Sequence, residues 1–160
     1  QKNYDFKNWT AELFYDTPLN KEKGTAITSY LGYFDTNFGP NYIRNVGANG
    51  FASGGTSLNG AGSTFPMMGT GSTIFYQLGY LMSKTEKGTQ LQPNFAVQYS
   101  DFDGLNDNTI VYDFGINCYF KGHANKLSLN YQNRPIYDKI TKKVDERKGM
   151  IVLQYQIEIN

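Results

Sequence analysis

The end of the chain alternates regularly between apolar and polar positions. From residue 151 onward every odd position is apolar: Ile151, Leu153, Tyr155, Ile157 and Ile159. A period of two predicts a β-strand with one apolar face and one mostly wet face. In a soluble sandwich or small barrel the apolar face is hidden, whereas in an outer-membrane barrel it faces lipid and the wet face lines the lumen.

The same alternation predicts six further strands, whereas helical periodicity is hard to find. These strands are Asn8–Asp16, Thr25–Asp35, Thr73–Met82, Leu91–Ser100, Ile110–Phe120 and Lys126–Arg134. The two faces of Thr25–Asp35 are hard to tell apart. Strands of about ten residues are long enough to cross a bilayer at the tilt of a barrel, whereas soluble strands are usually about five or six residues long. The predicted fold class is therefore all-β, an antiparallel transmembrane β-barrel.

The connections between these strands differ in length at the two ends. At one end the linkers are very long at Asn37–Gly71, medium at Asp103–Asn108 and long at Tyr137–Glu146, and at the other they are medium at Thr17–Gly24 and short at Lys84–Thr89 and Lys121–Asn125. Outer-membrane barrels have short periplasmic turns and longer external loops. Residues 1–160 therefore read as a single partial barrel domain, with residues 37–71 as a long extracellular loop. Whether this loop folds into the lumen stays open.

The two faces of the predicted strands differ in chemistry. The expected lipid face is rich in aromatic residues, as in interfacial girdles: Trp9, Tyr15, Tyr76, Tyr80, Tyr99, Tyr112, Phe120, Tyr131 and Tyr155. The opposite face is rich in neutral amides: Gln77, Gln92, Asn94, Gln98, Asn117, Asn130, Gln132, Gln154 and Gln156. Amides suit a wet lumen, where they bond to one another and to water. The alternative is that they form the exposed face of a soluble sheet.

Composition narrows the possible functions. Lys and Arg total 15 and Asp and Glu total 14, a formal charge of +1, which gives no sign of a nucleic-acid surface. No apolar run approaches the length of a transmembrane helix, and the single cysteine, Cys118, excludes an internal disulfide framework. Because the chain begins at Gln1 without an initiator Met or signal peptide, we expect a processed terminus or a fragment.

Catalytic and metal-binding patterns are weak. The Gly-rich stretch from Gly47 to Thr73 lacks the ending of a phosphate-binding loop, and no helix pattern follows it. His123 is the only histidine and lies in a tight turn, so a Ser-His pair and a zinc site are both disfavoured. Asp101, Asp103 and Asp107 lack the spacing of an EF-hand loop and favour an Asx-rich turn. We therefore expect no enzyme activity, no cofactor and no metal.

Several longer motifs resemble a known family of channels. They are "YFDTNFGPNYIRNVG", "MMGTGSTIFYQLGYLM", "LQPNFAVQYSDFDGL", "VYDFGINCYFKGHANKLSLNYQNRPIY" and "RKGMIVLQYQI". Together, from about Trp9 to Ile157, they resemble the C-terminal portion of a Bacteroidetes outer-membrane porin similar to the phosphate-selective porins O and P. The polar Glu158 and Asn160 depart from the aromatic terminus common in outer-membrane proteins.

The resemblance implies a barrel of about sixteen strands, often trimeric, that conducts small solutes or ions passively across the cell outer membrane. This chain would supply the last seven strands or so. Its partners would then be membrane lipid, lipopolysaccharide, the N-terminal strands of the same barrel, and either a homotrimer or an envelope complex. No nucleic-acid partner is expected. Because bacterial barrels almost always have an even number of strands, seven predicts either a missed strand or a barrel that continues beyond this chain.

The candidate lumen and selectivity residues lie on the amide-rich face or near it: Arg44, Arg134, Lys126, Gln98, Asn117, Asn130, Gln132 and Gln154. Phosphate selectivity needs clustered Lys or Arg in a constriction, but the charges expected on this face are mixed. Arg44 and Arg134 read more simply as loop or strand-end charges. Two functions stay open, a passive channel and a non-conducting barrel that serves an envelope complex. A soluble lipocalin-like binder is a distant third.

Overall fold

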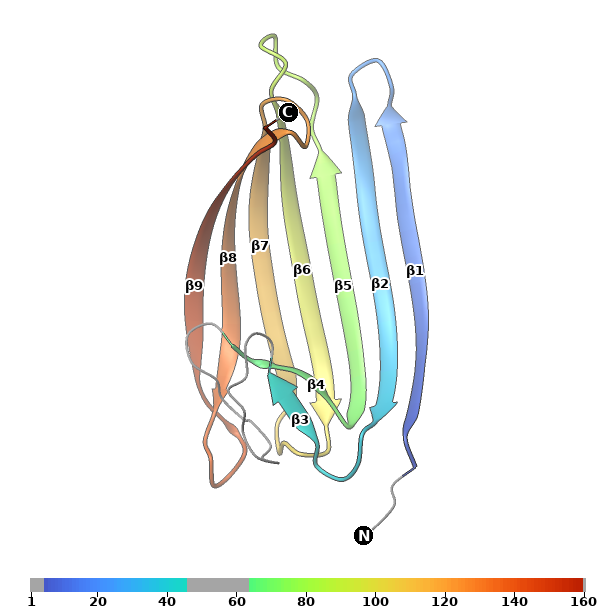
Figure 1. Ribbon diagram of the computed structural model, residues 1–160, viewed down its shortest axis with the longest axis vertical. Helices are drawn as coiled ribbons and strands as arrows, with labels where there is room; N and C mark the ends of the chain where they lie inside the picture. Colours follow the sequence, from blue (N-terminus) through green and yellow to red (C-terminus); the bar gives the residue numbers. More distant parts are fainter. Residues whose placement is uncertain (1–4, 46–63, 160) are drawn as a thin grey trace.

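The computed structural model describes residues 5–45 and 64–159, and in them the chain forms antiparallel β-structure with almost no helix. Seven long strands make one sheet in the order β1-β2-β5-β6-β7-β8-β9 (Figure 1). Their bounds are β1 Lys7–Asn20, β2 Thr25–Asn37, β5 Gly71–Leu81, β6 Gln90–Phe102, β7 Thr109–Tyr119, β8 Asn125–Tyr137 and β9 Val144–Ile157. The seven strands predicted from alternation are therefore confirmed, and each pairs with its sequence neighbour in the sheet.

Two short strands lie inside the linker that was predicted to be a plain loop. β3 (Ile43–Asn45) and β4 (Pro66–Gly69) pair antiparallel as a separate two-stranded sheet. Sequence alternation missed them because three or four residues are too few to show a period of two. Most of the Gly-rich stretch, residues 46–63, lies outside the described residues.

The strands extend further at the loop end than the alternation indicated. β8 continues through Pro135 to Tyr137, and β9 begins at Val144, so both ends of the predicted linker Tyr137–Glu146 belong to strands. In the register, Pro135 faces Arg147 and Ile136 faces Glu146. Backbone pairing thus continues through a charged segment that has no apolar alternation.

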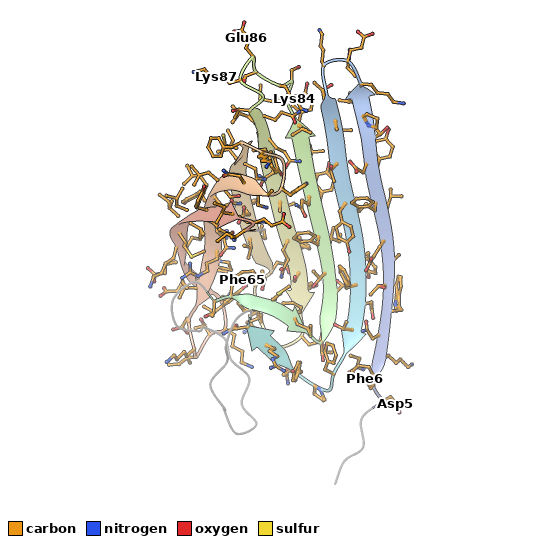
Figure 2. All side chains as sticks on the ribbon, turned by 45° about the horizontal axis from the view of Figure 1, so that its top comes forward. Asp5, Phe6, Phe65, Lys84, Glu86 and Lys87 are labelled. Atoms are coloured by element: carbon orange, nitrogen blue, oxygen red, sulfur yellow. The ribbon has the colours of Figure 1, made fainter. Side chains whose placement is uncertain are left out.

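The connections lie at the two ends of the sheet as the sequence predicts. The linkers β2–β5, β6–β7 and β8–β9 lie at the lower end in Figure 1, where the chain also starts, and the other three turns lie at the upper end near the C-terminus. We call these the loop end and the turn end. Figure 2 shows the sheet curving as an open trough, with β3 and β4 crossing it at the loop end.

The register sorts the side chains into two faces. Gln98 pairs with Phe75 and Val111, and Asn117 pairs with Gln92 and Ser128, so the predicted amide row shares one face across β5 to β9. We call it the polar face, and the opposite one the apolar face. β2, whose faces the sequence left unresolved, places Thr28 and Tyr30 on the polar face.

A small core closes the loop end of the trough. It consists of Ile43 of β3, Phe102 of β6, Leu105 of the β6–β7 loop and Tyr137 of β8, and Val144 of β9 packs against these four residues. The Tyr137 hydroxyl and the Thr109 Oγ1 lie 2.7 Å apart, and both residues are buried. Since Phe102 belongs to the polar face, this core shows that the described linker segment folds onto that face.

The two edges of the sheet remain separate. Among the described residues β1 pairs only with β2 and β9 only with β8, so these strands do not close a barrel within this chain. Most side chains of β1 and of the second half of β9 are exposed. The sheet is therefore open on both sides.

Candidate functional site

The centre of the polar face carries a hydrogen-bonded row of amides and hydroxyls. The Asn117 amide donates to Gln92 Oε1 at 3.2 Å, and the Tyr119 hydroxyl donates to the same oxygen at 2.7 Å. The Ser128 hydroxyl donates to Asn117 Oδ1 at 2.6 Å. The row joins β6, β7 and β8, so these polar side chains hold one another in fixed orientations.

Acidic side chains take part in this face as acceptors. The Asn130 amide donates to Asp113 Oδ1 at 2.8 Å, and the Thr28 hydroxyl donates to Asp16 Oδ1 at 2.9 Å. The register places both Asp113 and Asp16 on the polar face. They give the middle of the face a negative character.

A hollow of about 370 Å³ opens at the centre of the polar face. It is lined by Phe14, Thr28, Tyr30, Gln77, Gly79, Gln92, Asn94, Asn117 and Asn130. Gly79, Asn94 and Gly115 follow one another across the sheet in a single row of the register. Gly79 has no side chain and lines the hollow, whereas the space above Gly115 is taken by the Asn94 and Asn130 side chains.

Gly115 is needed for close approach of its neighbours. A Cβ at this position would lie 2.5 Å from the Asn130 Nδ2 and 2.6 Å from the Asn94 Oδ1. Both distances are shorter than van der Waals contact, so a larger residue would push the two amides apart. The glycine therefore lets Asn94 and Asn130 lean toward each other over the backbone of β7.

The polar face is covered at the loop end. Gln98, 6% exposed, donates to the Pro66 carbonyl of β4 at 3.3 Å and to the Ser100 hydroxyl at 2.9 Å. The Thr73 hydroxyl donates to the same Ser100 oxygen. Thr70 fixes the linker by donating to the Gly39 carbonyl and accepting from the Phe38 amide. Gln98, a predicted lumen residue, thus anchors the linker segment with β3 and β4, which we call the cover.

The predicted basic residues are not brought together. Arg134 lies within β8, three residues from the end of the strand, and is only 5% exposed. Arg44 is exposed on β3, opposite Met68. Lys126 pairs in the register with Tyr119 and Gln156 near the turn end.

The remaining predicted lumen residues, Gln132 and Gln154, share the polar face with Asn130 but lie outside the lining of the hollow. Sequence reasoning missed Tyr30 and Thr28 as site residues. The alternation of polar and apolar residues along β2 could have identified them, but aromatic residues stand on both faces of this strand and hide the alternation.

The apolar face shows the opposite chemistry. Leu153 is 68% exposed and Ile151 is 73% exposed, and exposed apolar side chains continue through Leu129, Ile116 and Ile74 across the sheet. At the loop end Arg147 donates to the Ile110 carbonyl at 2.8 Å, and its guanidinium carbon lies 5.5 Å from the centre of the Tyr112 ring. The face is thus broadly apolar with a basic group near one end.

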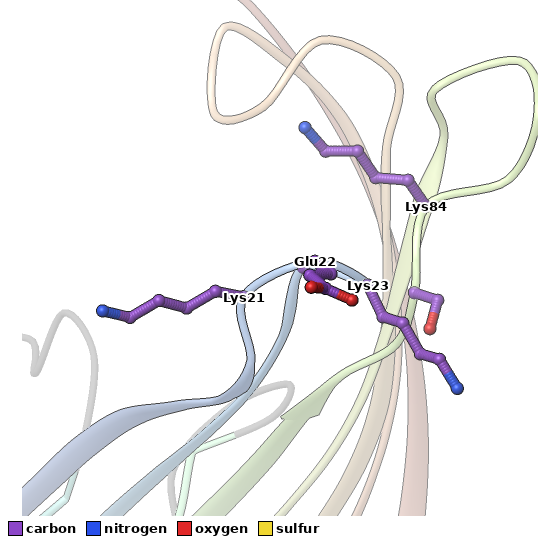
Figure 3. Close-up of a pocket in the computed structure, with 6 residues that line it drawn as sticks. Lys21, Glu22, Lys23 and Lys84 are labelled. Carbon is purple, nitrogen blue, oxygen red and sulfur yellow. The ribbon is translucent and has the colours of Figure 1, made fainter.

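A second hollow, of about 480 Å³, lies at the turn end between the β1–β2 and β5–β6 turns. Lys21, Glu22, Lys23 and Lys84 line it together with Gly24 and Ser83. In Figure 3 the three ammonium groups point in different directions, with Glu22 between them. The lysines therefore do not converge on a common anion.

Other chemistry is sparse in the described residues. They contain no group of three or more His, Cys, Asp or Glu side chains placed to hold a metal ion, and no helix long and apolar enough to cross a membrane.

The His123 ring stands edge-on to the Tyr119 ring, with centroids 5.3 Å apart. In the β8–β9 loop, hydrogen bonds from the Thr141 and Ile140 amides lower the pKa of the Asp138 carboxyl.

Comparison with known proteins gives no match. No protein-family model matches the sequence, and neither curated proteins nor solved structures show significant similarity to it.

Proposed function

We propose that this chain forms strands of an outer-membrane β-barrel porin, through which small hydrophilic solutes or ions diffuse passively. The observation that carries the proposal is the distribution of the two faces. Apolar side chains of the strand centres remain exposed, whereas amides and hydroxyls on the inner side of the trough bond to one another. A soluble sheet would bury the apolar face, but a barrel in lipid exposes it to hydrocarbon.

The strand dimensions support a membrane location. β8 has 13 residues, which at about 3.3 Å per residue and about 40° of tilt rise about 33 Å along the membrane normal. The apolar band of such barrels is about 25 Å tall. The strand is therefore long enough to cross the band and to reach both interfaces.

The surroundings of the barrel follow from this placement. Linker 37–71 and the β8–β9 loop would lie outside the cell, near lipopolysaccharide, and the turn end would lie in the periplasm. In hydrocarbon each unpaired backbone group costs several kcal/mol, so β1 and β9 need partner strands. We assign these to the N-terminal portion of the same barrel, as the Bacteroidetes porin resemblance implies, with a homotrimer as the corresponding assembly.

One observation favours a second candidate function. β3 and β4 pack on the polar face and contribute Ile43 to a buried core there. If the cover filled the lumen, the protein would be a non-conducting barrel that serves an envelope complex. The central hollow lies beyond this cover toward the turn end, and for that reason we favour the channel.

Single-channel recording tests the proposal. Purified protein in a planar lipid bilayer is expected to give stepwise, ohmic currents in KCl, and heat-denatured protein none. Asn117→Lys adds a cation beside the amide row and should shift the reversal potential toward anions, because charged rings set pore selectivity. A folded, bilayer-inserted protein that gives no current would contradict the channel and favour the non-conducting barrel.

A further inference from the structure

We propose that the central hollow of the polar face is a binding site for neutral, polyhydroxylated solutes of the saccharide class. The inference deepens the proposed function and rests on it, because a solute reaches this hollow through an open lumen. It also departs from the porin resemblance, which implies phosphate.

The lining offers the hydrogen-bond pattern that a sugar hydroxyl needs. An amide carries both a donor and an acceptor, so it can bond a hydroxyl in either direction. Five amides line the hollow, Gln77, Gln92, Asn94, Asn117 and Asn130, and the last of them already donates to Asp113. Gln92 and Asn117 are held in place by bonds to Tyr119 and Ser128.

Two of these amides remain available for a ligand. Among the described residues, the side chains of Gln77 and Asn94 make no hydrogen bond to another protein group. Asn94 stands between Gly79 and Gly115 in the register, and its Oδ1 leans over the backbone of Gly115. A ligand hydroxyl at this point can take both a donor and an acceptor without breaking an existing bond.

Aromatic side chains border the hollow on one side. Phe14 of β1 and Tyr30 of β2 are paired in the register, and both line the hollow. Phe14 is 65% exposed although it stands on the wet face. The face of an aromatic ring is apolar and slightly negative, so it suits the C–H groups on the flat side of a pyranose.

The charges around the hollow disfavour an anion. Asp16 and Asp113 accept hydrogen bonds from its rim residues Thr28 and Asn130. On β8 the basic residues of this face, Lys126 and Arg134, are each four positions from Asn130, which is about 13 Å along a strand. A phosphate in the hollow would therefore lie closer to these carboxylates than to either β8 cation, whereas a neutral sugar has no net charge to repel.

Saturation-transfer NMR on the protein in lauryldimethylamine oxide micelles, a detergent without a sugar head group, tests the site with maltotriose as the probe. We expect transfer to the sugar C–H protons, unchanged by excess inorganic phosphate. The double variant Gln77→Ala with Asn94→Ala should reduce the transfer at least threefold, because it removes only side chains without protein partners. Gln154→Ala, an amide of the same face outside the hollow, should leave it unchanged.

The outcomes separate this site from the channel. No transfer in wild type, equal transfer in the double variant, or displacement by phosphate would overturn the saccharide site. Ohmic conductance without maltotriose binding leaves the porin function standing and refutes this inference. Binding without conductance supports the hollow as a saccharide site and refutes the passive channel.

Discussion

Leu153 and Gln154 are adjacent in β9 at nearly the same depth but on opposite faces, so they form a matched pair for an arginine substitution. In the register Leu153 faces Leu129, and both stand on the apolar face. Leu129 is two residues from the middle of β8, which places this row about 5 Å from the midplane of the membrane. Gln154 faces Ser128 on the polar face.

The expected costs follow from these positions. An arginine on the lipid face costs about 2–4 kcal/mol at the midplane and about 0–1 kcal/mol near the interfaces. At this depth Leu153→Arg should destabilise the folded protein by about 2–3 kcal/mol. Gln154→Arg stays in water and should cost at most about 0.5 kcal/mol, as for an ordinary surface substitution.

Guanidinium titration of the protein in lipid vesicles, followed by tryptophan fluorescence, measures both variants. The predicted result is a large gap between Leu153→Arg and Gln154→Arg. Equal destabilisation of the two variants would refute the assignment of the apolar face to lipid. A larger loss for Gln154→Arg would mean that the polar face is buried instead.

Three further predictions concern the ends of the sheet. Protease added to intact cells should cut within residues 37–71 and spare the turn at residues 120–124, and cleavage at that turn alone would invert the topology. Tyr137→Phe should cost about 1–3 kcal/mol in a denaturant titration, because it leaves the buried Thr109 hydroxyl without its partner; an unchanged midpoint would show that this pair contributes nothing. Since the pKa of Asp138 is lowered from 3.8, its contribution to loop stability should be present above that value and be lost as the pH falls through the lower folded pKa. The hydrogen-exchange rates of the Ile140 and Thr141 amides should therefore rise at acidic pH in wild type, but should not follow this titration in Asp138→Asn. The same dependence of exchange on pH in both proteins would contradict the role of the Asp138 carboxylate in holding these amides.

The seven long strands could be predicted because alternation is a local property of the sequence. The extent of β8 and β9 could not, because Glu146, Arg147 and Lys148 are charged on both faces and pair through the backbone with a partner found only in three dimensions. β3 and β4 were missed for a similar reason: their position depends on contacts of Ile43 and Pro66 with a distant part of the sheet.

The site was predictable in part. Because amides recur at every second position of the strands, the sequence places Gln98, Asn117, Asn130 and Gln154 on one face, and the register confirms this. The hollow itself is lined from several strands, with Gly79 of β5, Asn94 of β6 and Asn130 of β8 in one row of the register, and no single strand contains that information. The burial of Arg134 likewise arises from packing at the loop end rather than from its sequence context.

The side of the sheet that meets lipid can be measured directly by spin-label accessibility along β9. With Cys118 replaced by Ser, single cysteines at positions 150 to 157 would carry a nitroxide in the membrane-inserted protein. Collisions with oxygen are expected to peak at odd positions such as Leu153 and Tyr155, and collisions with a water-soluble nickel complex at even positions such as Gln154 and Gln156. The opposite phase, or water accessibility at every position, would contradict a barrel whose apolar face lies in lipid and whose amide face lines a wet lumen.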